Sequence, residues 1–294
     1  MSSFVLYTVT GLGLGGLYFL LASGLSLIFG LMSVLNLAHG AFFAAGGYAA
    51  WWVMDTLTAI PPGPRFLLAV LGAALVGTVA GAAVEMGLVR RLYGRHVEQI
   101  LLTIGLGMAA VALMGGWFSY DPRLMAQPDW FLSTTRLAGA NIPNNRLLIL
   151  GVAVAMLVGL MLFLARTRHG LIIRAGVENP SMVRALGIDV SRSFTIVFAL
   201  GGLMAGVGGA LGAVYFNGIH PGLGTTQLIF AFIVVVIGGL GSVPGTAVAA
   251  LVVALTQVYV NNYLASGMGS ISVVILLAIV LLIRPQGLLG RVQP

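Results

Sequence analysis

The chain alternates long apolar runs with short polar or glycine-rich interruptions, and this pattern predicts membrane-spanning helices. The expected apolar segments are Phe4 to Gly30, a run that resumes after Gly40 and ends near Met54, Phe66 to Val89, Val97 to Trp117, Leu147 to Ala165, Ser193 to Tyr215, Leu228 to Leu240, Ala247 to Val260 and Ile271 to Ile283. About 20 apolar residues in a helix suffice to cross a bilayer, so we expect an all-α polytopic membrane protein of about eight or nine transmembrane or re-entrant helices. Residues 1–294 would form a single transmembrane domain.

Composition supports this class. The chain is 59% hydrophobic and 7% charged, whereas soluble domains carry about 25% charged residues. It contains no cysteine, which excludes disulfides and cysteine-ligated zinc. No lysine or arginine precedes Met54, so the start lacks the basic region of a cleaved signal peptide, and we expect the first helix to be retained.

The net charge of +7 rests on arginine alone, and arginine placement predicts topology rather than nucleic-acid binding. Ten arginines are expected inside and four outside; the inner ones are Arg90, Arg91, Arg95, Arg166, Arg168, Arg174, Arg184, Arg192, Arg284 and Arg291, and the outer ones are Arg65, Arg123, Arg136 and Arg146. Ser193 to Ile283 carries no formal charge, so it must cross an even number of times, with 228–262 either crossing twice or forming a re-entrant pair. The N-terminus lies outside if both early segments cross, and inside if one is re-entrant.

The polar segment from Arg166 to Arg192 is expected on the inner face and contains one short predicted helix. Asn179 is a suitable N-cap, Pro180 suits the first helical position, and Gly187 suits the end. One face of this helix is apolar, with Met182, Val183 and Leu186, whereas Ser181 and Arg184 point elsewhere. A helix of about two turns is not stable alone, so we expect it to dock on a partner.

Two interruptions fall inside apolar runs and are the candidate translocation pathway. The first contains Asn36, His39 and Gly40, with Tyr48 in the helix that follows, and the second contains Gly238, Gly239, Gly241, Ser242 and Pro244. Paired interruptions in the two halves of a membrane protein indicate a transport site near the midplane. For His39 we weigh a packing role equally with a pathway role.

Catalytic motifs are absent. The sequence has no HExxH, GxxxxGK[ST] or GxSxG pattern and no paired carboxylates on one face, so we expect no enzyme activity, no metal and no cofactor. Glu85 and Glu98 are predicted to form interfacial ion pairs with Arg90, Arg91 or Arg95. Few acidic residues lie in the membrane to bind Na⁺ or relay H⁺, which favours an external ATPase as the energy source.

Four motifs carry a family resemblance. RAGVENPSMVRALGI (174–188), LNLAHGAFFAAGGY (35–48), IGGLGSVPGTAVAAL (237–251) and RPQGLLG (284–290) resemble segments of the ABC importer permeases for branched-chain amino acids, and they cover essentially the full length. The chain resembles the H-type permease subunit of the high-affinity importers, a multi-pass protein of the bacterial inner membrane.

The resemblance implies partners and roles. A second homologous permease, two cytoplasmic ABC ATPases and a periplasmic binding protein would complete the importer, and the permease pair could be hetero- or homodimeric. The ATPase-coupling residues would be Arg174, Glu178, Asn179, Pro180, Met182, Val183, Arg184, Leu186 and Gly187. Closure of the ATPases would then drive alternating access of the permease.

Three alternatives stay open. Similar permeases carry urea, short amides or other small organic solutes, although an apolar pathway fits a branched-chain amino acid slightly better. The chain could instead be an autonomous channel whose filter is formed where the two broken segments meet. An intramembrane enzyme is disfavoured by the missing catalytic groups.

Overall fold

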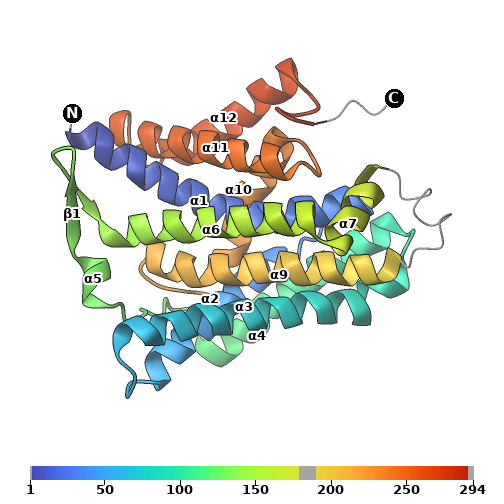
Figure 1. Ribbon diagram of the computed structural model, residues 1–294, viewed down its shortest axis with the longest axis horizontal. Helices are drawn as coiled ribbons and strands as arrows, with labels where there is room; N and C mark the ends of the chain where they lie inside the picture. The colour runs from blue at the N-terminus through green and yellow to red at the C-terminus, as the bar shows by residue number, and fades with distance from the viewer. Residues whose placement is uncertain (1, 179–189, 291–294) are drawn as a thin grey trace.

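The computed structural model of the protein describes residues 2–178 and 190–290, and the described chain is almost entirely helical (Figure 1). The long elements are α1 (Ser2–Met32), α2 (His39–Thr56), α3 (Pro62–Gly87), α4 (His96–Phe118), α6 (Asn144–Arg166), α9 (Val190–Tyr215), α10 (Leu223–Gly238), α11 (Val243–Tyr263) and α12 (Met268–Ile283). Shorter elements are the 3₁₀ helix η1 (Val89–Leu92), α5 (Asp129–Leu132), α7 (Arg168–Glu178) and the antiparallel strands β1 (Thr134–Leu137) and β2 (Ala140–Pro143). The all-α polytopic class is confirmed, and among the described residues six helices are long and apolar enough to cross a membrane.

The two ends of the helix bundle define its outer and inner faces. The N-terminus, α5 and the β1–β2 hairpin lie at one end, and α7 lies at the other (Figure 1). Val9 of α1 packs against Ala140 and Ile142 of the hairpin. The N-terminus lies at the end of the bundle that carries the hairpin, which is the end where Arg136 and Arg146 were predicted to lie outside.

Helices α10 and α11 run in opposite directions and join at the inner end of the bundle. A backbone bridge between Arg123 and Ile219 places the segment before α10 beside the outer loop. Its far end meets the C-terminal segment, where Leu288 N–H donates to the carbonyl of Ile237 (2.7 Å). Helix α11 returns to the outer end, where Tyr259 stacks on Phe4 with ring centroids 5.7 Å apart. The junction of α10 and α11 therefore lies beside the C-terminal segment that follows α12, and not at mid-membrane as the predicted re-entrant pair would place it.

Helix α9 is the centre of the packing. It runs antiparallel to α3, and glycines bring the two backbones together, because a Cβ on Gly77 would overlap the carbonyl of Gly202 and a Cβ on Gly81 would overlap that of Phe198. Its other faces contact α1 and α2. Small residues are how membrane helices approach closely when no water-driven force pulls them together.

Two short elements, α7 and the β1–β2 hairpin, were not predicted from the sequence. Helix α7 occupies residues that we expected to be a polar connection, because its buried Ile173 and Gly176 rest on the inner end of α1 and the hydropathy pattern does not reveal that support. The β1–β2 hairpin was also not predicted from the sequence. The predicted short helix at 179–187 lies outside the described residues.

The close approach of Gly77 and Gly81 in α3 to the backbone of α9, here called the glycine seam, leads to a prediction about stability. Gly77→Ala should lower the melting temperature of the detergent-solubilised protein, because its methyl group meets backbone that cannot rotate away, and overpacking of this kind costs about 1–3 kcal/mol. Gly105→Ala in α4 is the matched control, since nothing lies within 4 Å of the position that its methyl group would take. Equal melting temperatures for the two variants would show that the α3–α9 seam is not close-packed.

Candidate translocation site

The first predicted interruption is a real break between α1 and α2. Ser33 takes a positive φ of 54° and ends α1, and the chain continues without helical structure to Ala38. The side-chain oxygen of Asn36 accepts from Ala38 N–H (3.2 Å), and the side chain is wholly buried. The amide nitrogen of Asn36 has no hydrogen-bond partner within the described structure.

His39 opens α2 and is fixed between two other helices. Its Nε2–H donates to the carbonyl of Leu21 in α1 (3.1 Å), and its side chain is fully buried. A Cβ on Gly24 would lie 2.8 Å from the imidazole and one on Gly201 would lie 3.3 Å from it, so the ring needs glycine on both neighbours. The Nδ1 atom has no partner in the described parts of the chain. The ring therefore packs three helices together and also leaves one polar atom unused, which an ordered water or a passing solute could satisfy.

Gly40 and Tyr48 extend the site along α2. A Cβ on Gly40 would lie 2.6 Å from the carbonyl of Gly224, so this glycine lets α10 approach α2. Tyr48 stacks on Phe118 of α4 with ring centroids 4.5 Å apart and an interplanar angle of 15°. Three of the four predicted residues of the first group therefore lie in α2, and Asn36 lies in the break just before it.

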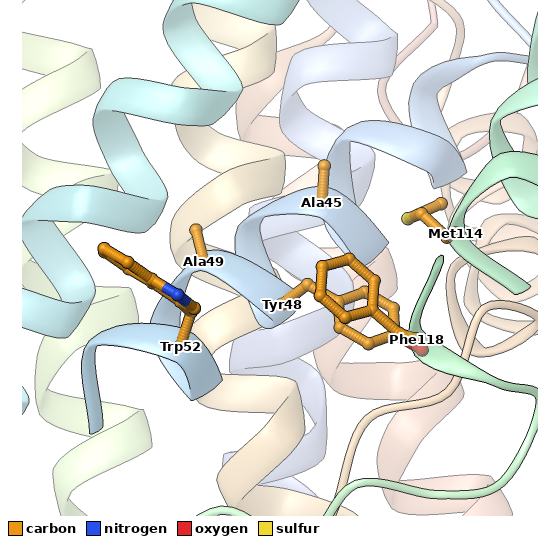
Figure 2. A pocket seen from close by; sticks show the side chains of 6 residues that line it. All are labelled: Ala45, Tyr48, Ala49, Trp52, Met114 and Phe118. Atoms are coloured by element: carbon orange, nitrogen blue, oxygen red, sulfur yellow. The ribbon is translucent and has the colours of Figure 1, made fainter. Parts of the chain in front are cut away.

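An apolar pocket of about 270 Å³ lies between α2 and α4, beside this stack (Figure 2). Its lining residues are Ala45, Tyr48, Ala49, Trp52, Met114 and Phe118. Sequence reasoning selected only Tyr48. The spacing of Ala45 and Ala49 on one helical face could have indicated a hollow, but nothing in the sequence shows that Met114 and Phe118 of α4 form its other wall or that it opens to the surface beside the exposed Trp52.

The second predicted interruption lies at the inner face, beside the C-terminal segment. Leu288 and Leu289 donate backbone hydrogen bonds to Ile237 and Gly238 at the end of α10. Gly239 and Gly287 face each other with φ values of 100° and 80°, a backbone conformation that favours glycine. The carbonyls of Ile237 and Gly238, which end α10, are therefore satisfied by N–H groups 51 residues later in the chain.

The same interruption starts α11. The hydroxyl of Ser242 accepts from Gly245 N–H (3.2 Å), as an N-cap does, and Pro244 occupies the first turn. Gly241 has a φ of 82°. The second interruption therefore serves to end α10 and to start α11.

The two predicted pathway groups lie at opposite ends of α10. Gly40 meets Gly224 near its first residue, whereas Gly238 is its last. A helix of 16 residues spans about 24 Å at 1.5 Å per residue. The two broken segments do not meet, which removes the geometry on which the channel alternative depended.

On the inner face, α7 carries the start of the predicted coupling set. Thr167 Oγ1 accepts from Gly170 N–H (2.9 Å) and caps the helix, Arg174 is exposed, and Glu178 is its last residue. The remaining coupling residues, Asn179, Pro180, Met182, Val183, Arg184, Leu186 and Gly187, lie outside the described residues.

The predicted ion pairs are present on this face. Glu85 pairs with Arg90 (3.0 Å) and is fully buried, whereas Glu98 pairs with Arg95 (3.2 Å) and both members are exposed. Tyr93 also donates to Glu85. Burial raises the pKa of the Tyr93 phenol, and the hydrogen bond to Glu85 raises this pKa further, so the phenol stays protonated.

The described residues contain no cluster of histidine, cysteine, aspartate or glutamate that could hold a metal ion. A bundle of long apolar helices with buried polar residues at a helix break is the architecture of a multi-pass membrane protein. Residues 7–284 match the family described as branched-chain amino acid transport system / permease component, and the chain belongs to that family.

Characterised relatives match along nearly the whole chain. The high-affinity branched-chain amino acid transport system permease protein BraD of Pseudomonas aeruginosa is 30% identical over 291 residues, covering 96% of this chain and 94% of BraD. LivH of Escherichia coli, a permease protein of a transport system with the same description, is 28% identical and covers the same shares. LivM of Escherichia coli, also a permease protein of such a system, is 25% identical over 95% of this chain and 69% of LivM.

The cap on α10 generates a prediction. Gly287→Ala should lower the melting temperature, because alanine at positive φ is strained by about 1 kcal/mol and its methyl group would crowd Gly239. Leu289→Ala is the control, since its side chain is half exposed and only its backbone forms the cap. If Gly287→Ala melts like the wild type, the C-terminal segment does not hold α10.

Proposed function

We propose that the chain is the translocation subunit of an ATP-driven ABC importer for branched-chain amino acids, working by alternating access. The family match over residues 7–284 carries the proposal. A sequence without nucleotide-binding motifs must take its energy from elsewhere, and the segment 179–187 has the pattern of a docking helix for cytoplasmic ATPases.

The relatives suggest the other subunits. Escherichia coli has two permease proteins of the branched-chain system, LivH and LivM, and this chain is similar to both. We infer a pair of permease subunits in which this chain takes the LivH position, together with two ATPases and a periplasmic binding protein.

The site suggests the substrate. Asn36, His39 and Gly40 would line the middle of the pathway, and the pocket at Tyr48 would receive the aliphatic side chain in the outer half. The pocket lining is entirely apolar or aromatic apart from one buried hydroxyl, which suits leucine, isoleucine or valine better than urea or a short amide. The inner exit of the pathway would be shaped by the end of α10 and the start of α11, which contain Gly238, Gly239, Gly241, Ser242 and Pro244.

The docking helix can be tested by placing one acid on each of its predicted faces. Leu186→Asp should abolish co-purification of an ATPase with the solubilised chain and abolish leucine uptake, because a carboxylate on the apolar face cannot enter an apolar groove without a large desolvation cost. Ser181→Asp, on the polar face, is the matched control and should retain both. Normal uptake in Leu186→Asp would contradict the docking role, as would an equal loss in both variants.

The pocket can be tested by filling it. Ala49→Phe should reduce leucine uptake by roughly tenfold, equivalent to about 1.4 kcal/mol of lost binding, while expression is unchanged. Ala155→Phe on the exposed face of α6 is the control for added bulk. Labelled urea tested in parallel addresses the substrate, since uptake of urea but not leucine by the wild type would overturn the assignment.

A further inference from the structure

Glu85 is a buried carboxylate that the pathway does not use. Its side chain has no exposed surface, yet both oxygens are fully engaged: Oε1 accepts from Arg90 Nε (3.1 Å) and the Tyr93 hydroxyl, and Oε2 accepts from Arg90 (3.0 Å) and the Thr195 hydroxyl (2.7 Å). These donors come from η1, from the residue after it and from α9. We call Glu85, Arg90, Tyr93 and Thr195 the inner clasp.

The clasp joins segments far apart in the sequence. Glu85 and Thr195 are 110 residues apart, and a second hydrogen bond from Arg90 to Thr195 (2.7 Å) closes the network. Phe194, the neighbour of Thr195, meets the Tyr93 ring edge-on with centroids 5.0 Å apart. Two successive side chains of α9 are therefore held by the inner end of α3 and by η1.

Stability alone is a weak reason for this arrangement. The Glu85 carboxylate is fully desolvated, whereas the Arg90 side chain keeps 41% of its surface exposed. Solvent weakens the attraction of the exposed partner, so the cost of desolvating the carboxylate offsets most of it. A buried polar network is better suited to fixing one geometry between two elements.

The position of the inner clasp indicates why the geometry between α3 and α9 needs to be fixed. Thr195 lies on α9 shortly after the segment 179–189, which leads from α7 into α9. Beyond the clasp, the glycine seam at Gly77 and Gly81 binds α3 to α9 backbone against backbone. The clasp holds the end of α3 against the start of α9. A displacement at the start of α9 would therefore move α3 with it.

We propose that the inner clasp is a positioning element that transmits movement from the ATPase-coupling segment through α9 to α3, with Glu85 as its centre. This inference rests on the proposed function. It assigns Glu85, Arg90, Tyr93 and Thr195 to energy coupling, although none of them was predicted to take part.

The test uses the complete complex of permease, ATPase and binding protein. Glu85→Gln keeps the side-chain shape but puts an NH₂ group against donors, and it should reduce both leucine uptake and the stimulation of ATPase activity by loaded binding protein over the basal rate. The expected reduction is roughly fivefold or more, the lower end of typical coupling between sites. Glu98→Gln, in the exposed pair on the same face, is the matched control and should behave like the wild type.

Thr195 provides the variants that separate coupling from folding. Thr195→Val removes the hydroxyl at nearly constant shape and should lower the stimulated-to-basal ATPase ratio, whereas Thr195→Ser keeps the hydroxyl and should restore the ratio. Complex yield and melting temperature should be equal for the two variants. A normal ratio in Thr195→Val and Glu85→Gln would overturn the inference, as would a loss of ratio in Thr195→Ser equal to that in Thr195→Val.

The inference and the proposed function fail differently. If the wild-type chain does not bind an ATPase, the proposed function is wrong. If the wild type is coupled and every clasp variant is coupled equally, only the clasp is wrong.

Discussion

The close approach of backbones along α9 is the constraint on which the rest of the structure depends. In a bilayer the lipid tails are as apolar as the side chains, so helices associate through van der Waals contact rather than through exclusion of water. Gly202 meets Gly77 of α3, and Gly209 meets the backbone of α2 at Phe43. Gly201 leaves room for the His39 ring. Each contact requires a position without a side chain, which explains why glycine is frequent in a chain that needs few turns.

The two interruptions of the helical pattern satisfy their backbone hydrogen-bonding groups in different ways. Backbone groups at membrane depth need partners inside the protein. At the first break, the Asn36 side chain bonds the following turn. At the second, the C-terminal segment supplies N–H groups to Ile237 and Gly238. The first break leaves the Asn36 amide nitrogen and His39 Nδ1 without partners in the interior of the described structure, whereas the second lies at the inner face, where it ends α10 and starts α11.

The sequence was most informative where one local property decides the outcome. Hydropathy located the long helices, and the Asn36–Gly40 break was visible as polar residues in an apolar run, whereas the orientation that arginine placement indicates stays a prediction. The other features of the structure depend on packing between elements that are distant in the sequence. Helix α7 depends on its contact with α1, the pocket depends on α4 closing over Tyr48, and the clasp depends on Thr195 reaching Glu85. None of these contacts has a spacing that identifies it in the sequence. The separation of the two breaks along α10 likewise emerges only from the three-dimensional arrangement.

The helix breaks of the described chain do not join into a pore, and under the proposed function the chain moves a solute only when the ATPases drive it. The most direct measurement is leucine uptake into proteoliposomes containing the purified complex, with ATP inside or outside and with or without the binding protein. The account predicts accumulation above the external concentration only when ATP and the binding protein are both present on their proper sides. Equilibration of leucine by the chain alone, without ATP, would contradict it.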